Sequence, residues 1–210
     1  MMRMERKYIK PASLMLGRLF EDQLKTIFPN PEERKAKSPY VAELELRTSL
    51  PTSLVFITSP QLEGIAVWVH SDNWGKRPFW RLVIAGLDWP AFKIGVRALY
   101  KMEKSNNFME SKHKQLVQGK HWYLALLAVD TPYQGKGFGS MLLNEMLNRI
   151  DEEGLPCYLE TFGEKNPSMY QHFGFQVVEE FVAPGDKEAT IAMVRQPKVR
   201  VSAVTQTAGE

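Results

Sequence analysis

The chain has 210 residues, of which 44% are hydrophobic and 24% are charged, and this is the composition of an ordinary globular domain. The formal net charge of +3 is too small to indicate a nucleic-acid-binding protein, and no run of about 18 apolar residues indicates a membrane span. The charged start of the chain does not resemble a signal peptide, and the single Cys157 excludes an intrachain disulfide. We therefore expect a cytoplasmic protein with one domain over 1–197, a mobile tail over 198–210, and neither nucleic acid nor a membrane as partner.

The first half of the chain predicts helices around one hairpin. Apolar residues recur at helical spacing in two stretches, and two strand-like runs are separated by a loop that is too long for a two-residue turn. Prolines 78 and 90 divide an aromatic-rich stretch into short helical pieces. The predicted elements are helices over 13–27 and 40–50, strands over 54–58 and 65–70, helical pieces within 74–100, and a polar helix that continues into 101–120.

The second half alternates strands and helices. Residues 123–129 form an almost uninterrupted apolar run, which predicts a strand buried on both faces of a sheet. This alternation is typical of an α/β fold. The elements that follow are a helix over 138–150, a strand over 157–161, a helix that begins at Asn166, and strands over 175–178 and 189–195.

A glycine-rich turn lies between the central strand and the helix after it. Three glycines stand there at alternate positions, and glycine lets the backbone approach a ligand closely. The free N–H groups at a helix N-terminus carry a partial positive charge, so such a turn predicts a phosphate-binding site. The alternative is that the glycines only build a tight turn. The residues of the predicted site are Gln134, Gly135, Lys136, Gly137, Phe138, Gly139 and Ser140.

The spacing of this turn fits neither the dinucleotide-binding pattern nor the P-loop. It resembles the pyrophosphate-binding signature [RQ]-x-x-G-x-[GA] of the GNAT N-acetyltransferases, with Gln134, Gly137 and Gly139 on the three specified positions. The resemblance implies the GNAT (acyl-CoA N-acyltransferase) fold, in which helices flank a mixed, twisted central sheet. It also implies acetyl-CoA as co-substrate, and we expect no metal ion.

A second segment strengthens this resemblance. The order of Glu160, Asn166, Tyr170 and Gly174 is similar to the second half of the GNAT core, where an Asn and a Tyr lie one helical turn apart. The motif pattern most resembles the branch that contains puromycin N-acetyltransferase and related bacterial enzymes. The implied reaction is direct transfer of an acetyl group to an amine within a ternary complex.

The resemblance also implies roles for residues of the central strand. The backbone N–H of Val129 is expected to polarise the thioester carbonyl, with Leu127 lining the pantetheine slot and Ala128 as a further cofactor contact. Asn166 either bonds the pantetheine arm or caps its own helix. Tyr170 is the expected acid for the departing thiolate, because a phenol and an alkyl thiol have similar unperturbed pKa values. The alternative for Tyr170 is a core tyrosine.

The general base is the least determined part of the site. Glu160, at the end of its strand, is the best single carboxylate, and a structural or solvated role is the alternative. A base acting through water, or an amine that arrives neutral, also remains open. Less well-placed candidates are His121, Asp88, Glu43 and His70.

For the cysteine, the lysines and the aromatic residues, a structural or solvated role is weighed against a role in the site. Cys157 suits a buried, inert thiol better than an acyl carrier. The lysines within 101–120 suit a solvated helix face better than a site for the cofactor's 3′-phosphate or a polyanion. Among the aromatic residues, Trp68 and Trp80 are candidates for the wall of an amine pocket, with core packing as the alternative. We therefore expect an acetyltransferase for a small-molecule amine, as a monomer or homodimer; a protein lysine or N-terminus as acceptor, and a non-catalytic coenzyme A sensor, are the alternatives.

Overall fold

The computed structural model describes residues 1–73, 88–163, 166–186 and 188–198. Trp80 and most of the predicted tail fall outside these ranges. The strands are β1 (Met2–Arg3), β2 (Leu54–Ile57), β3 (Gly64–His70), β4 (Trp122–Val129), β5 (Cys157–Phe162), β6 (Gln176–Phe181) and β7 (Thr190–Arg195). The α-helices are α1 (Ile9–Leu19), α2 (Pro31–Ser49), α4 (Asp88–Ile94), α5 (Val96–Leu116), α6 (Phe138–Glu153) and α7 (Asn166–His172). Short 3-10 helices are η1 (Arg6–Tyr8), η2 (Glu21–Leu24), η3 (Ser71–Asn73) and η4 (Thr131–Tyr133).

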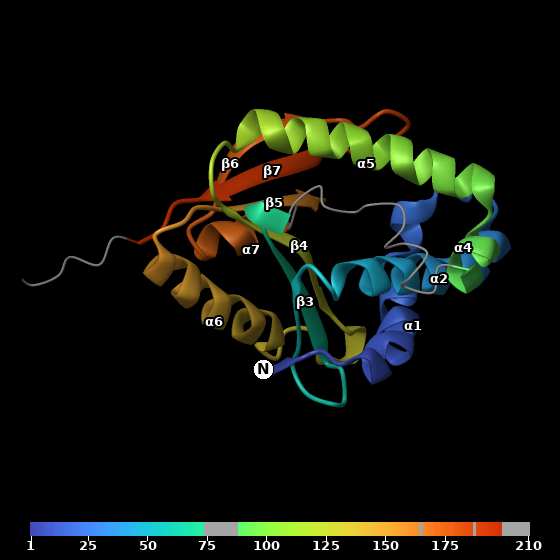
Figure 1. The fold of residues 1–210 in the computed structure, drawn as a ribbon, viewed down its shortest axis with the longest axis horizontal. Helices are drawn as coiled ribbons and strands as arrows, with labels where there is room; N and C mark the ends of the chain where they lie inside the picture. The colour runs from blue at the N-terminus through green and yellow to red at the C-terminus, as the bar shows by residue number, and fades with distance from the viewer. Residues whose placement is uncertain (74–87, 164–165, 187, 199–210) are drawn as a thin grey trace, which may run out of the picture.

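The strands form one mixed sheet in the order β1-β2-β3-β4-β5-β7-β6. The pair β4–β5 is parallel, and the other described pairs are antiparallel. Helices cover both faces (Figure 1). One core cluster joins α6 and α7 to one face, and separate clusters join α1 and the end of α5 to the other. The expected α/β fold with a mixed, helix-flanked sheet is confirmed.

The N-terminal helices begin earlier than the apolar spacing predicts. The first starts at Ile9 rather than at residue 13. The second starts at Pro31 rather than at residue 40, because its N-terminus is well capped: the Asn30 side chain accepts a hydrogen bond from the Glu33 N–H at 3.0 Å. Proline at the first helical position loses no intrahelical bond. The short strand β1 was not predicted, because two residues carry no readable alternation.

The sheet opens between its two parallel strands. Described pairing between β4 and β5 is limited to residues 122–124 with 157–159, after which β4 continues along β3 and β5 along β7. The register between β3 and β4 shifts between Val67 and Trp68, which leaves Ala125 as an extra residue on β4. This β-bulge lies just beyond the last residue of β4 that pairs with β5. The result is a V-shaped split at the carboxyl ends of β4 and β5.

No helix among the described residues is both long and apolar enough to serve as a membrane span.

Candidate active site

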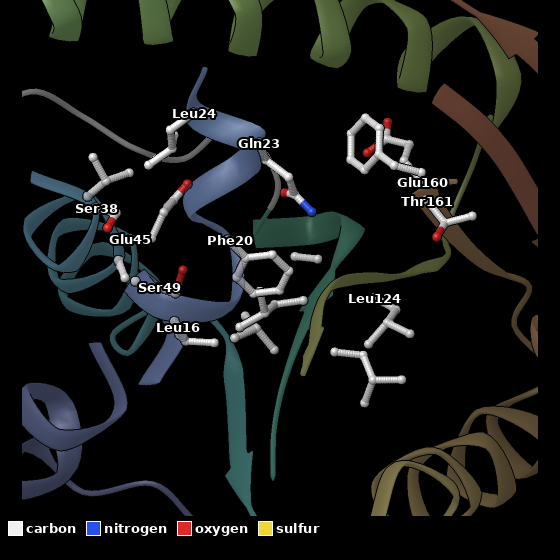
Figure 2. Close-up of a pocket in the computed structure, with 18 of the residues that line it drawn as sticks. Leu16, Phe20, Gln23, Leu24, Ser38, Glu45, Ser49, Leu124, Glu160 and Thr161 are labelled. Carbon is white, nitrogen blue, oxygen red and sulfur yellow. The ribbon is translucent and has the colours of Figure 1, made fainter. Parts of the chain in front are cut away.

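A cavity of about 330 Å³ occupies the split. Ala125 and Leu126 line it from the face that packs on α1, whereas Leu127 and Tyr170 line it from the face that packs on α6. The cavity therefore passes through the sheet. Most of its lining side chains are apolar, and α1, η2 and α2 supply a large part of its wall (Figure 2).

The backbone at the end of β4 faces this split. The β3 partner of Val129 is Gly64, whose C=O and N–H both bond to Thr58 on the β2 side, at 3.0 Å each. In an antiparallel pair, opposite residues either bond to each other or both point away. The N–H and C=O of Val129 therefore point towards the side that β5 has left, and the same alternation applies to Leu127. The C=O of Val129 accepts a hydrogen bond from Gln134 Nε2 at 3.1 Å, and its N–H faces the opening.

The glycine turn adopts a backbone conformation that requires glycine. Gly135 and Gly137 have φ angles of 75° and 85°, and Gly137 is the N-cap of α6. A Cβ atom built on either residue would have no neighbour within 4 Å. The space beside the turn is therefore open, and the N–H groups at the start of a 16-residue helix border it. Gly139 lies inside the helix, where a Cβ would contact Val129 at an ordinary 3.6 Å.

The other side chains of the turn are at the surface. Gln134 ties the turn to the end of β4, as described above. The Lys136 ammonium lies 5.5 Å from the ring centroid of Tyr133, and the ring of Phe138 meets Tyr133 edge-on at 5.9 Å. Ser140 is exposed on the first turn of α6. None of residues 134–140 lines the cavity, so the turn borders the outer end of the split rather than its interior.

Tyr170 lines the cavity from α7 and is only 8% exposed. Burial, and to a smaller extent the nearby Cys157, raise its pKa to about 12. Its ring packs edge-on against Phe175 at 5.8 Å. From the sequence, Tyr170 was either a catalytic acid or a core tyrosine. In the structure its side chain is as buried as a core residue and also borders the cavity, so both alternatives stay open.

Glu160 lines the same cavity from the opposite face of the sheet. Its carboxylate accepts hydrogen bonds from Tyr123 at 2.7 Å and from Tyr158 at 2.9 Å. Burial raises the pKa of Glu160, while the two hydroxyl donors act in the lowering direction. A buried carboxylate with a raised pKa is a stronger base than a solvated one.

The other candidate bases lie elsewhere. His121 is buried outside the cavity and bonds to His113. Glu43 is buried on α2 and forms an ion pair with Arg47. His70 stacks edge-on against Trp122 at 5.0 Å, at the far end of β3. Asp88 begins α4, and its side chain is outside the described part of the chain. Glu160 is thus the one carboxylate of the sequence-based set that the described cavity includes.

Three further predicted residues have distinct positions. Asn166 lines the cavity, and its side-chain amide donates to the C=O of Phe162 at 2.6 Å, which ties α7 to the end of β5. Ala128 is buried in the cluster under α1, and its backbone is paired towards β3. Trp68 is completely buried in the α6-side core, so core packing describes it and it does not wall the cavity.

Two parts of the site were missed by the sequence reasoning. The wall opposite Glu160 includes residues of the N-terminal helices, which the sequence did not indicate; Figure 2 shows Phe20 and Gln23 on it. The sequence reasoning also did not identify the two tyrosines that bond to Glu160. For Tyr158 the sequence did carry a signal, because it precedes Glu160 by two residues and both side chains therefore share one face of the strand.

Known proteins resemble this chain in sequence and in fold. The model of the Acetyltransferase (GNAT) family matches residues 93–175, which include β4, the glycine turn, α6, β5 and α7. The chain also superposes on a crystal structure of histone acetyltransferase HPA2 and related acetyltransferase from Corynebacterium glutamicum, over 96% of this chain and 97% of that one, with a TM-score of 0.60 and 19% identity. The fold is the GNAT fold. Arylalkylamine N-acetyltransferase 2 of Aedes aegypti shares this GNAT fold over 94% and 98% of the chains, with a TM-score of 0.55 and 15% identity.

Curated relatives match a shorter region. An uncharacterized N-acetyltransferase of Schizosaccharomyces pombe is 34% identical over 84 residues, which is 39% of this chain and 34% of that protein. A probable serine/threonine-protein kinase of Dictyostelium discoideum is 31% identical over 80 residues, 37% of this chain and 11% of that protein. The matched region spans about a third of the first relative and about a tenth of the second.

Proposed function

We propose that the chain is an acetyl-CoA-dependent N-acetyltransferase that acts on the primary amine of a small molecule by direct transfer in a ternary complex. The observation that carries the proposal is the split between β4 and β5, with Glu160 on one face of the sheet and Tyr170 on the other. A base and an acid on opposite sides of one opening suit a reaction in which an amine enters from one face and a thiol leaves at the other.

The residues of the split fit acetyl-CoA. The open space beside Gly135 and Gly137 admits a diphosphate against the N–H groups at the start of α6. The apolar edge at Leu127 suits the pantetheine arm, and the N–H of Val129 faces the opening. When bound, acetyl-CoA supplies a thioester, which is the activated form of the acetyl group.

In this proposal the protein positions the reactants and moves two protons. The Val129 N–H donates to the carbonyl oxygen, an effect worth about 3 to 4 kcal/mol for one such donor in a dry site. Glu160 accepts the proton of the attacking amine nitrogen, and Tyr170 donates a proton to the sulfur as the C–S bond breaks. Solvent then takes the proton from Glu160 and restores the one on Tyr170, so the enzyme returns to its starting state.

The cavity supports a small acceptor. A volume of about 330 Å³ is at the lower end of the range for small-molecule pockets, and its walls are mostly apolar. Within the family, we propose the branch of puromycin N-acetyltransferase-like enzymes, supported by the order of Glu160, Asn166, Tyr170 and Gly174. The buried, unpaired Cys157 supports a reducing compartment such as the cytoplasm.

The test is a turnover screen with acetyl-CoA, read by thiol release, across puromycin, an aminoglycoside, phenethylamine and a lysine-containing peptide. The proposal predicts turnover with at least one small amine. Turnover of the peptide alone would assign a protein acceptor, and acetyl-CoA binding without any turnover would assign a coenzyme A sensor. Binding is measured separately: acetyl-CoA at about 100 times its Kd should stabilise the fold by roughly 2.7 kcal/mol, which raises Tm by about 5 to 10 °C. Equal shifts with NAD and ATP would refute the assignment of the cofactor.

A further inference from the structure

Two tyrosines from neighbouring strands bond to the predicted base. Tyr123 of β4 and Tyr158 of β5 are partners in the parallel register, and Glu160 follows on the same face of β5. Each phenol bonds to a different oxygen of the carboxylate: Tyr123 to Oε2 and Tyr158 to Oε1. The contact from Tyr123 crosses the gap where β4 and β5 have begun to separate, so the pair holds the carboxylate at the inner end of the split.

The two phenols serve as donors and not as proton acceptors. Burial raises the pKa of both, and the nearby Glu160 charge raises them further. Smaller effects in the same direction come from Glu45 on Tyr123 and from Glu179 on Tyr158. Both hydroxyls therefore keep their protons at working pH. An ionised Glu160 is the form that gains most from two such donors, because hydrogen bonds to a charged acceptor are the strongest kind.

Two uncharged histidines lie behind the tyrosines. His113 of α5 stacks on Tyr158 with ring centroids 4.2 Å apart, and its Nε2 lies 2.8 Å from Nε2 of His121. His121 Nδ1 donates to the Gly119 C=O at 2.8 Å, so its Nε2 accepts from His113. Burial lowers the pKa of His121 and lowers that of His113 to about 3. Among the described residues, the other titratable and charged groups around Glu160 and its tyrosines include His113, His121, Glu45 and Glu179, with Lys112 paired to Glu179 and Lys114 acting on His113.

The charge of the groups next to the Glu160 carboxylate determines how well it can accept a proton. Among the described residues, no Lys, Arg or His lies within ion-pair distance of its carboxylate. A cationic partner would hold the carboxylate ionised but make it a poor proton acceptor. Two neutral donors orient the carboxylate while leaving it able to take a proton.

We propose that Tyr123 and Tyr158 are positioning residues for the general base, and that their hydroxyls hold the Glu160 carboxylate where it meets the attacking amine. The inference rests on the proposed function, since it assigns Glu160 as the base of that reaction. It extends that function by naming two residues that act through Glu160 rather than on the substrate.

The experiment compares Tyr123→Phe and Tyr158→Phe with the wild-type enzyme, and uses Tyr100→Phe as the matched control because that ring is 73% exposed on α5. Two readouts are followed against pH: kcat/KM for the fastest amine of the screen, and the carboxyl ¹³C signal of Glu160, assigned by its loss in Glu160→Gln. Removing a donor should favour the protonated carboxyl, so both the NMR midpoint and the acid limb of kcat/KM should move to higher pH. At pH values below the limb, kcat/KM should fall roughly tenfold, with a loss of less than about threefold on the high-pH plateau. Tyr100→Phe should change neither.

A uniform loss of activity at every pH, or an unmoved limb, would overturn the proposal, since a merely structural role predicts one of these results. A shift of the NMR midpoint without a shift of the limb would also overturn it, because Glu160 would then be held by the tyrosines without being the base. If the wild-type protein acetylates no amine, the proposed function fails first. The NMR midpoint, which needs no turnover, then shows separately whether the phenols hold the carboxylate.

Discussion

The two sides of the β4–β5 split differ in how the chain builds them. The side proposed for the cofactor is built mainly from one contiguous segment, 127–140, in which a strand, a turn and a helix follow each other, and α7 adds Tyr170. The side proposed for the acceptor combines β5, the N-terminal helices and two tyrosines from different strands. Because most of the cofactor side comes from one stretch of sequence, it can be predicted from sequence motifs. The acceptor side forms only when elements that are distant in the sequence pack together.

The largest expected effect concerns the acceptor side. Glu160→Gln keeps the size of the side chain and its hydrogen-bonding oxygen but removes the proposed base, so kcat should fall by about 10² to 10⁴. Steady-state kinetics by thiol release measure the loss, and equilibrium binding of acetyl-CoA should stay within about threefold of wild type. A variant with full kcat would mean that the amine loses its proton to another group or to water.

Tyr170 tests the acid at the opposite face. Tyr170→Phe should lower kcat by about tenfold or more, because the departing sulfur would lose its proposed proton donor. An acid acts in its protonated form, and burial raises the pKa of Tyr170 to about 12, so this contribution should persist from neutral pH up to about pH 12. The check is a pH profile of the ratio of wild-type to variant kcat, and a ratio that disappears in the neutral range would remove Tyr170 from this role.

Phe20 tests whether the N-terminal helices form the acceptor wall. Phe20→Ala removes apolar contact area from the cavity, so KM for the amine should rise about tenfold while KM for acetyl-CoA stays nearly unchanged. Phe92→Ala is the matched control, since Phe92 is 76% exposed on α4. An equal rise in both KM values would show that the two sides of the split are not separate.

The smallest effect is expected at the glycine turn. Gly137→Ala places a Cβ in the space proposed for the diphosphate and strains a backbone with φ of 85°, so the Kd for acetyl-CoA should rise several-fold. Gly154→Ala, at the other end of α6, has the same kind of strain at φ of 66° and equally open surroundings. Calorimetry should find similar losses of Tm in both variants but weaker acetyl-CoA binding only in the first.

This contrast also explains how far the sequence could be interpreted. The order of strands and helices from Trp122 onward follows from apolar runs, glycines and caps, which act locally, and the structure confirms it. The prediction of where α2 starts was wrong because the Asn30 cap and Pro31 outweigh a weak apolar pattern. Trp68 was a candidate for the pocket wall because a tryptophan side chain suits either a pocket wall or a core. Only the packing of α6 on β3 decides between these two positions.

The surroundings of Glu160 also could not be predicted from the sequence. A carboxylate at the end of a strand is visible in the sequence, but its basicity depends on burial and on the Tyr123 hydroxyl, which reaches it from the next strand. Such a contact depends on strand order and register, and neither is encoded by local periodicity.

A crystal structure of the protein with coenzyme A would test the proposed site without an intermediate step. We expect the diphosphate on the backbone N–H groups at the start of α6, the pantetheine along β4, and the thiol between Glu160 and Tyr170. Coenzyme A bound on another surface, or a thiol that ends outside the split, would contradict it.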